Sequence, residues 1–221
     1  RQGLNGPDGE LHPCQKALID FHGSQCGFCT PGFVMSLFTA WSNKHGLMAE
    51  DIDDTLAGNL CRCTGYRPIV EAGLSLKNAK QPQWELDRNE ILKKELLKIK
   101  SSEPVEITDG KNSFSVPTNY EDFSTTYADQ PSATIVSGAT DIGLWVTKQN
   151  RNLPNMIWTG RVEEFSKIDQ QEDFIIIRPA VTHQEAMEKL GSKWPTINAL
   201  WKRFGSVQVR NSGTVCGNLA N

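Results

Sequence analysis

The sequence predicts two domains of different fold class, an all-α domain over residues 1–77 and an α+β domain over residues 111–221. In the first region, apolar residues recur at helical spacing, with prolines near helix starts and glycines near helix ends. In the last region, short runs rich in Val, Ile and Phe alternate with helical segments. The segment 78–110 between them is strongly charged and contains no cysteine, so we predict a linker there.

Helix boundary signals divide the first domain into short helices. Pro13 stands early in a helical pattern and Gly23 stands where that pattern stops. Thr30 is the expected N-cap of the next helix, with Pro31 just inside it. Four helices are therefore expected, over residues 11–23, 30–46, 49–59 and 65–76.

The second domain mixes strand and helix patterns. Strands are expected in FSVP, ATIVSG and EDFIIIRPAV, which are residues 114–117, 133–138 and 172–181. Helices are expected over residues 120–130 and 182–191. In the linker, apolar residues could form a narrow edge on one partly docked helix, at Ile91, Leu92, Leu96 and Ile99.

Bulk composition excludes several classes of partner. The net charge of −3 gives no basic surface, so nucleic acid is not an expected partner. No apolar run approaches the roughly 20 residues that a membrane helix needs, so no membrane association is expected. The chain begins at Arg1 and stops at Asn221 inside an apparent motif, so we expect an internal piece of a longer protein.

Four of the six cysteines lie in two tight pairs, in CGFCTPG (residues 26–32) and CRCTGYRP (residues 61–68). Secreted disulfide domains are short and spread their cysteines widely. This clustering within a long chain instead favours metal ligation in a reducing compartment.

Each cysteine pair is predicted to lie in the turn between two helices. Packing the two hairpins would bring four thiols together, and four thiolates need a cation to remain ionised. Helix N-termini and two nearby cations, Arg62 and Arg67, suit an anionic centre. The pairs are 31 residues apart and the second is C-x-C, a spacing that leaves both zinc and an iron–sulfur cluster open.

The remaining candidate ligands have simpler interpretations. Cys14 is interpreted as a small buried apolar residue. Other residues of ligand type are interpreted as helix ends and surface positions, namely His12, His22, His45 and Asp53.

A glycine-containing turn follows the strand predicted at 133–138. The stretch IVSGATDIGLW (135–145) would let backbone N–H groups reach an anion such as a diphosphate. It matches neither the P-loop pattern nor G-x-G-x-x-G, because Leu144 and Trp145 stand where a P-loop has Lys and Ser or Thr. From these residues alone, a plain tight turn remains the alternative.

Two long segments resemble one known family. HPCQKALIDFHGSQCGFCTPGFVMSLF and GNLCRCTGYRPIVEAG are similar to the four-helix [2Fe–2S]-binding domain of the molybdenum hydroxylases, most of all to the small subunit of two-chain xanthine dehydrogenases. The resemblance implies that a [2Fe–2S] cluster is ligated by Cys26, Cys29, Cys61 and Cys63. It also implies that Gln25, with Cys63, faces the molybdopterin of a partner.

The second half is similar to the FAD-binding domain of the same family. VSGATDIG and QVRNSGTVCGN resemble its two diphosphate loops, which implies an α+β domain of the vanillyl-alcohol-oxidase type, here incomplete. Cys216 stands where the family usually has glycine, which puts the geometry of the second loop in doubt. The implied FAD contacts are Ile135, Val136, Ser137, Gly138, Ala139, Thr140, Asp141, Ile142, Phe204 (near the adenine), Thr214, Gly217 and Asn218.

The resemblance implies an electron-transfer unit with no catalytic residue of its own. A molybdopterin subunit or domain would hydroxylate xanthine or hypoxanthine, and electrons would pass through two [2Fe–2S] clusters and FAD to NAD⁺. A cytoplasmic hetero-oligomer is expected. One alternative is the same architecture acting on an aldehyde or another N-heterocycle. A second is a structural zinc module fused to a nucleotide-binding interaction domain.

Overall fold

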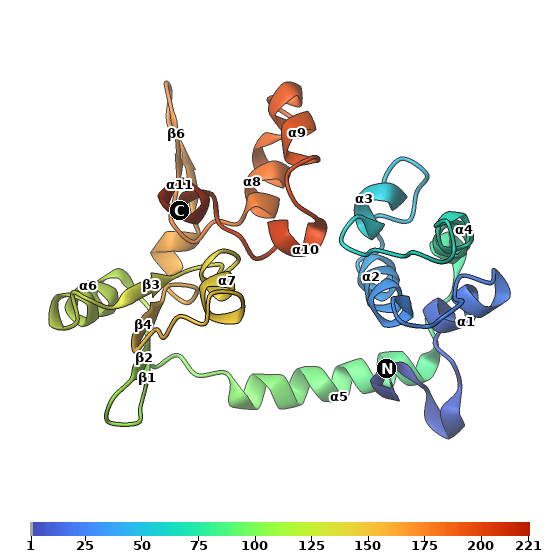
Figure 1. The fold of residues 1–221 in the computed structure, drawn as a ribbon, viewed down its shortest axis with the longest axis horizontal. Coiled ribbons are helices and arrows are strands. Elements are labelled where there is room, and N and C mark those ends of the chain that lie inside the picture. The colour runs from blue at the N-terminus through green and yellow to red at the C-terminus, as the bar shows by residue number, and fades with distance from the viewer. Residues whose placement is uncertain (1) are drawn as a thin grey trace. The chain divides into compact units, whose positions relative to one another are not determined.

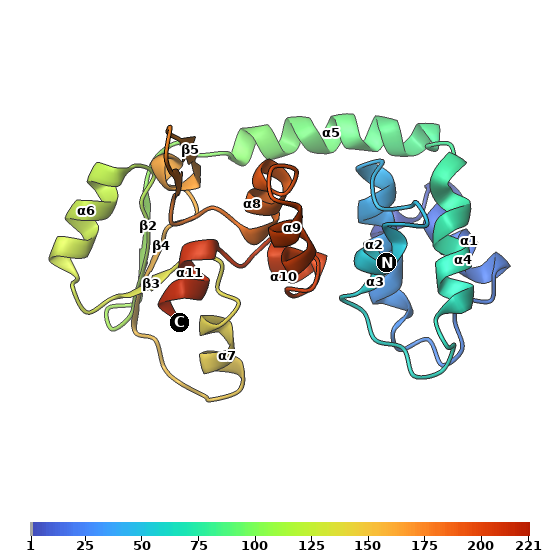
Figure 2. The same cartoon turned by 90° about the horizontal axis from the view of Figure 1, so that it is seen from above.

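The computed structural model describes residues 2–221 and divides the chain into two compact units (Figures 1 and 2). The first unit ends at Lys100 and the second begins at Ser101. Within the part of the chain described, no helix has the length and apolar character needed to cross a lipid bilayer.

The first unit contains five α-helices and three short 3₁₀ turns among its described residues. The α-helices are α1 (Pro13–Asp20), α2 (Thr30–Ser42), α3 (Ile52–Leu56), α4 (Arg67–Ser75) and α5 (Gln83–Ile99). The 3₁₀ turns are η1 (Gln2–Leu4), η2 (Pro7–Gly9) and η3 (Leu76–Asn78). Each of the four expected helices is present, although α1 stops before Gly23 and α3 is only five residues long.

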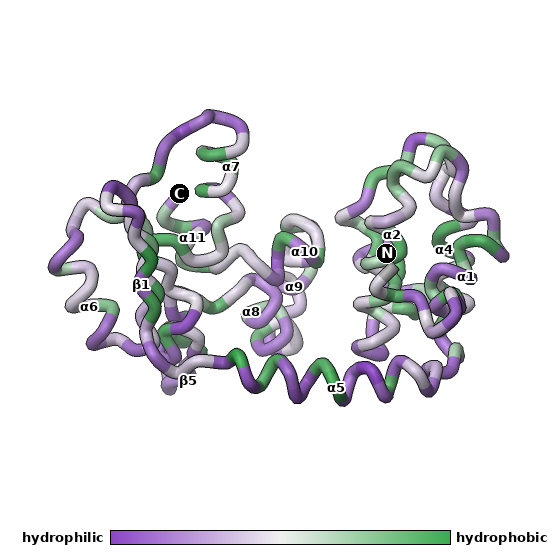
Figure 3. The backbone as a smooth tube through the Cα atoms, turned by 90° about the horizontal axis from the view of Figure 1, so that it is seen from below, coloured by the Kyte–Doolittle hydropathy of each residue, from purple (hydrophilic) through white to green (hydrophobic). Residues whose placement is uncertain are grey.

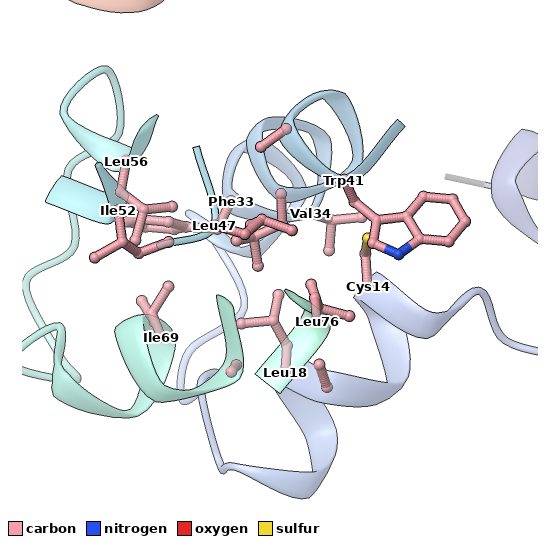
Figure 4. Close-up of a cluster of buried hydrophobic side chains, with 14 of the residues drawn as sticks. Cys14, Leu18, Phe33, Val34, Trp41, Leu47, Ile52, Leu56, Ile69 and Leu76 are labelled. Atoms are coloured by element: carbon pink, nitrogen blue, oxygen red, sulfur yellow. The ribbon is translucent and has the colours of Figure 1, made fainter. Parts of the chain in front are cut away.

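Helices α1 to α4 pack around one apolar core, shown in Figure 4. Leu37 and Ile69 are fully buried there, and Cys14 lies beside Trp41, as expected for a small apolar side chain. Gly73 lets α4 approach its neighbours closely, because a Cβ atom at this position would lie 2.7 Å from Ile52 and 2.9 Å from Leu37. This core builds the frame that carries the two cysteine turns.

A buried polar pair joins the start of α1 to the start of α5. His12 is the N-cap of α1, and its Nδ1 accepts a hydrogen bond from the Cys14 backbone N–H at 3.1 Å. The ring proton is therefore on Nε2, which donates to Glu85 Oε2 at 3.3 Å. Both side chains are almost completely buried. Burial lowers the pKa of His12, and the Glu85 carboxylate opposes that effect.

The segment predicted as a linker carries more secondary structure than expected. It contains α5, of which Glu85 is the buried residue, and also strand β1 (Val105–Thr108) of the second unit. The predicted apolar edge of α5 is exposed, and Figure 3 shows it as alternating apolar and polar stretches. The connecting stretch is therefore short, because β1 is already paired with its neighbour in the sheet.

The second unit contains a four-stranded mixed sheet with the order β1-β2-β4-β3. Strand β2 (Ser113–Val116) pairs antiparallel with β1 and parallel with β4 (Asn155–Trp158), which in turn pairs parallel with β3 (Thr134–Val136). A separate antiparallel hairpin is formed by β5 (Ile168–Gln170) and β6 (Ile175–Ile177). The helical elements are α6 (Tyr120–Asp129), α7 (Ile142–Thr147), η4 (Glu163–Ser166), α8 (His183–Leu190), α9 (Pro195–Trp201), α10 (Val207–Arg210) and α11 (Val215–Ala220).

The parallel strands bring their carboxyl ends to one edge of this sheet. Ile157 at the centre of β4 is fully buried, and Val136 in β3 is nearly so. Figures 1 and 2 show α6 on one face of the sheet and α7 and α11 on the other. The loop after β3 therefore leaves the sheet on the side where α11 also begins.

Several expectations need correction. The N-cap of α2 is Cys29, because Thr30 already has helical backbone geometry. The strand expected over 172–181 is reduced to Ile175–Ile177, in a hairpin outside the main sheet. The patterns did not predict β4, β5 or the short helices α7, α9, α10 and α11, which lie in stretches without clear periodicity.

Candidate metal centre and cofactor cavity

The first cysteine turn is built around a left-handed glycine. Gly27 has a φ of +82°, which an L-residue adopts with difficulty, and this bend separates Cys26 from Cys29. Cys29 caps α2 and packs against the helical core, whereas Cys26 is exposed. The helix therefore starts immediately after the second thiol, as the sequence predicts for this pair.

The second cysteine turn is held by tyrosine and threonine side chains. The Cys61 backbone N–H donates to the Tyr66 hydroxyl at 3.0 Å, and Tyr66 itself has a φ of +70°. The Thr64 hydroxyl lies 3.1 Å from Cys61 Sγ. Helix α4 begins only at Arg67, so a turn separates Cys63 from the helix, unlike the first pair.

The structure brings the four predicted ligand sulfurs together in two contacts that cross between the turns. Cys63 Sγ lies 3.5 Å from Cys26 Sγ, and the Cys29 and Cys61 thiols are close enough to shift each other's pKa. Cys26 and Cys63 are exposed, and Cys29 and Cys61 are half-buried against the core.

This paired arrangement bears on which metal the site fits. Over residues 2–221, no three His, Cys, Asp or Glu side chains form a group that could hold one metal ion. A zinc site needs four ligands around one point, whereas in a two-iron cluster each iron takes two thiolates. The two pairs of sulfurs match in number the two thiolates that each iron of a two-iron cluster takes.

Each sulfur contact pairs one thiol of lowered pKa with one of raised pKa. The Thr64 hydroxyl and backbone N–H lower the pKa of Cys61 to about 7, while burial and the Cys61 thiol raise the pKa of Cys29. The Phe28 backbone N–H lowers the pKa of Cys26, whose thiol in turn raises the pKa of Cys63. Ionising one thiol of a contact therefore opposes ionisation of the other, so a cation would favour four thiolates at this site.

The other residues considered for this site lie apart from it or make different contacts. Arg67 forms an ion pair with Glu71 at 2.9 Å along α4. Gln25 is exposed next to Cys26. Burial raises the pKa of Cys14 to about 12, in keeping with an apolar role. His12 lies at a helix end, as expected, but its side chain is buried. The other three residues of ligand type are exposed, namely His22, His45 and Asp53.

A cavity of about 840 Å³ lies in the second unit. It is lined by the loop after β3 and by the segment leading into α11, which are far apart in the sequence. Every residue predicted to contact FAD lines this cavity, with the exception of Val136. The Val136 side chain instead packs in the core between the sheet and its covering elements.

Tryptophan and backbone contacts fix the first loop. Trp158 Nε1–H donates to the Ser137 carbonyl at 3.0 Å, and the Thr159 N–H donates to the Val136 carbonyl at 2.9 Å. Ala139 has a φ of +58°, a left-handed conformation that non-glycine residues rarely adopt outside functional loops. The left-handed residue lies within the loop that lines the cavity.

The second loop is held against the first and against α8. A Cβ atom on Gly138 would overlap the carbonyl group of Ser212, so only glycine fits at this position. The Val215 N–H donates to the Val181 carbonyl at 3.0 Å, and Thr214 Oγ1 accepts the Gly217 N–H at 3.1 Å. Glycine at this contact lets the two loops adjoin along the cavity wall.

Cys216 is accommodated without closing the cavity. Its thiol lies 3.5 Å from the Ile177 carbonyl oxygen, so the side chain is directed toward β6. The patterns missed other lining residues, among them Trp145, Thr159 and His183. These residues come from three separate segments, and nothing in their local sequence indicates a shared cavity.

Comparison with protein families identifies both units. Residues 109–221 match the FAD binding domain in molybdopterin dehydrogenase. Residues 1–74 match the [2Fe–2S] binding domain. The chain belongs to the molybdopterin dehydrogenase family. It carries an iron–sulfur-binding domain followed by an FAD-binding domain, as the sequence predicts.

Curated relatives match the N-terminal third of this family member. Xanthine dehydrogenase/oxidase of Gallus gallus is 56% identical over 70 residues, covering 32% of this chain and 5% of the relative. Aldehyde oxidase 1 of Oryctolagus cuniculus is 51% identical over 71 residues, with the same coverage. Quinoline 2-oxidoreductase from Pseudomonas putida 86 has a TM-score of 0.46 at 21% identity, over 52% of this chain and 41% of that one. The matched region is thus a small part of each curated relative.

Proposed function

We propose that this chain is the electron-transfer part of a xanthine dehydrogenase, with a [2Fe–2S] cluster held by Cys26, Cys29, Cys61 and Cys63. The observation that carries the proposal is the pair of sulfur contacts between the two turns, one of them at 3.5 Å. The family membership of both domains supports it.

We place FAD in the cavity of the second unit. The left-handed Ala139 and the close approach of Gly138 to Ser212 form a cradle of backbone groups suited to a diphosphate. Asp141, Thr214 and Asn218 supply side chains along the same wall. The volume of about 840 Å³ is of the size used by large cofactors.

When bound, the two cofactors supply one- and two-electron redox chemistry between a molybdopterin partner and NAD⁺. The chain contributes binding and positioning. Cys29 and Cys61 anchor one side of the centre to the core, whereas Cys26, Cys63 and Gln25 remain exposed toward a partner. A second cluster would lie in another domain of the same cytoplasmic hetero-oligomer.

The substrate is proposed from the relatives. Xanthine or hypoxanthine is favoured because a xanthine dehydrogenase/oxidase is 56% identical over the matched region. An aldehyde is the second candidate, because an aldehyde oxidase is 51% identical there. No residue described above forms a substrate site, so the choice between these substrates is tested on the assembled enzyme. Turnover of xanthine with NAD⁺ supports the proposal, whereas turnover of aldehydes alone favours the second candidate.

The metal assignment is tested by elemental analysis of the full-length enzyme purified without oxygen. Iron, acid-labile sulfide and visible absorption should all fall when any one of the four cysteines is replaced by serine. Cys14→Ser is the matched control, because Cys14 is buried in the core and away from the site. A colourless protein that holds one zinc ion after anaerobic reconstitution with iron and sulfide would reject the cluster.

A further inference from the structure

One buried side chain on the cavity wall has a hydrogen-bonding nitrogen without a protein partner. His183 is the first residue of α8, is 6% exposed, and lines the cavity. Its Nε2 is buried and makes no hydrogen bond within residues 2–221. Buried polar groups of this kind are normally satisfied, so a ligand atom is the natural partner.

The hydrogen bond at the other ring nitrogen fixes the tautomer. Trp201 Nε1 lies 3.3 Å from His183 Nδ1, and an indole nitrogen can only donate. Nδ1 is therefore the acceptor, and the proton of the neutral ring is on Nε2. Burial lowers the pKa of His183, which keeps the ring neutral. With Nδ1 occupied and Nε2 protonated, the ring has no lone pair for a metal and offers one N–H donor to the cavity.

The position of this donor is tied to residues expected to contact FAD. The His183 backbone N–H donates to the Gly213 carbonyl at 3.0 Å, next to Thr214 of the second loop. The imidazole ring packs on Phe204, with 4.4 Å between ring centroids. A ligand that touches Phe204 and the second loop therefore also passes the imidazole.

We propose that His183 is a further cofactor-binding residue, whose Nε2–H donates a hydrogen bond to an acceptor nitrogen or oxygen of bound FAD. The inference rests on the proposed placement of FAD in this cavity. It adds a side-chain donor to a site otherwise described by its backbone loops.

Three substitutions separate the donor from the bulk of the side chain. His183→Met removes the donor and keeps a similar size, whereas His183→Gln places an amide N–H near the position of Nε2. His183→Asn can reach only the position of Nδ1, so it provides a polar control. Each variant is made in the full-length enzyme, stripped of flavin and titrated with FAD by fluorescence quenching, with the thermal midpoint of the flavin-free protein as the check on folding.

We expect the Met and Asn variants to bind FAD at least tenfold more weakly than the wild type, and the Gln variant to remain within about threefold. If the Met variant fails to fold, the Gln and Asn variants provide the same comparison. Wild-type affinity in the Asn or Met variant, or equal weakening in all three, overturns the role of His183 and leaves the FAD site standing. A wild-type protein that binds no FAD overturns both proposals.

Deaza analogues of FAD, each lacking one ring acceptor, identify the acceptor atom. For one analogue, the affinity for the wild type should be lower than that of FAD. The affinity of the same analogue for the Met variant should be no lower than that of FAD. Suppose instead that every analogue loses the same affinity for the wild type and for the Met variant. If the Met variant binds FAD more weakly than the wild type, as expected, the acceptor is then an oxygen of FAD. If the Met variant binds FAD as tightly as the wild type, the result counts against the proposal.

Discussion

The Ser212 hydroxyl donates a hydrogen bond of 2.7 Å to the Gly138 carbonyl and so joins two loops that are 74 residues apart in the sequence. The same two residues are in backbone contact, because a side chain at position 138 would overlap the Ser212 carbonyl group. The cavity wall thus depends on a contact that only glycine permits.

Gly138→Ala should force these loops apart and lower the flavin content of the purified enzyme severalfold, with a loss of stability of about 1–3 kcal/mol. The matched control is Gly143→Ala in α7, where an added Cβ would meet no atom within 4 Å. Bound flavin per chain and the thermal midpoint are measured for both. Full flavin content in the position-138 variant would show that the loop contact is dispensable.

Thr64→Val should shorten the lifetime of the cluster. The Thr64 hydroxyl is 3.1 Å from Cys61 Sγ, and hydrogen bonds to sulfur stabilise the thiolate ligand. The equivalent threonine of the first turn, Thr30, instead contacts Ser24 at 2.7 Å, so Thr30→Val is the control. Decay of visible absorption under a chelator should be faster in the first variant only, and equal decay would remove the role of Thr64.

The buried pair of His12 and Glu85 should make stability depend on pH. Burial lowers the pKa of His12 in the folded state, so below about pH 6.5 the unfolded chain takes up the proton first. The free energy of unfolding should therefore decrease as the pH falls from 7.5, by at most about 1.4 kcal/mol at pH 5.5. Urea unfolding at both values checks this against His12→Gln, which should show a smaller difference. An unchanged pH dependence would exclude His12 as the cause.

Arg210→Met should destabilise the second unit by roughly 3 kcal/mol. The Arg210 side chain is fully buried, and its guanidinium donates to Gln184 Oε1 at 3.1 Å and to the Gly205 carbonyl at 3.3 Å. Replacing it removes a charged donor from two acceptors that are at most partly buried, and a hydrogen bond to a charged group contributes about 1.5–3 kcal/mol. Arg203→Met, at an exposed position, should change the thermal midpoint little. Similar midpoints for the two variants would contradict this assignment.

Local signals predicted the elements that are locally determined. Helices were expected over residues 120–130 and 182–191, and the structure has α6 and α8 there, with a capping box of Thr182 and Glu185 at α8 and an Asn119 cap on the Asp122 N–H at 2.9 Å at α6. The two cysteine turns were also found, because glycine, proline and repeated cysteines mark them within a few residues.

Longer-range features could not be read in this way. Strand β4 is only four residues long, and its place between β2 and β3 depends on pairing with segments distant in sequence. From the sequence, His183 is an ordinary residue at a helix start. Its contacts with Trp201 and Phe204 are known only from the structure. The N-cap of α2 was misassigned by one residue because Cys29 supplies no side-chain cap bond to signal it.

Leu37 and Ile69 are sealed from solvent in the helical core that carries the cysteine turns. Two of the four sulfurs, on Cys26 and Cys63, remain accessible from outside. A cluster held at this site would therefore meet its surroundings through the side of the turns that carries Cys26 and Cys63.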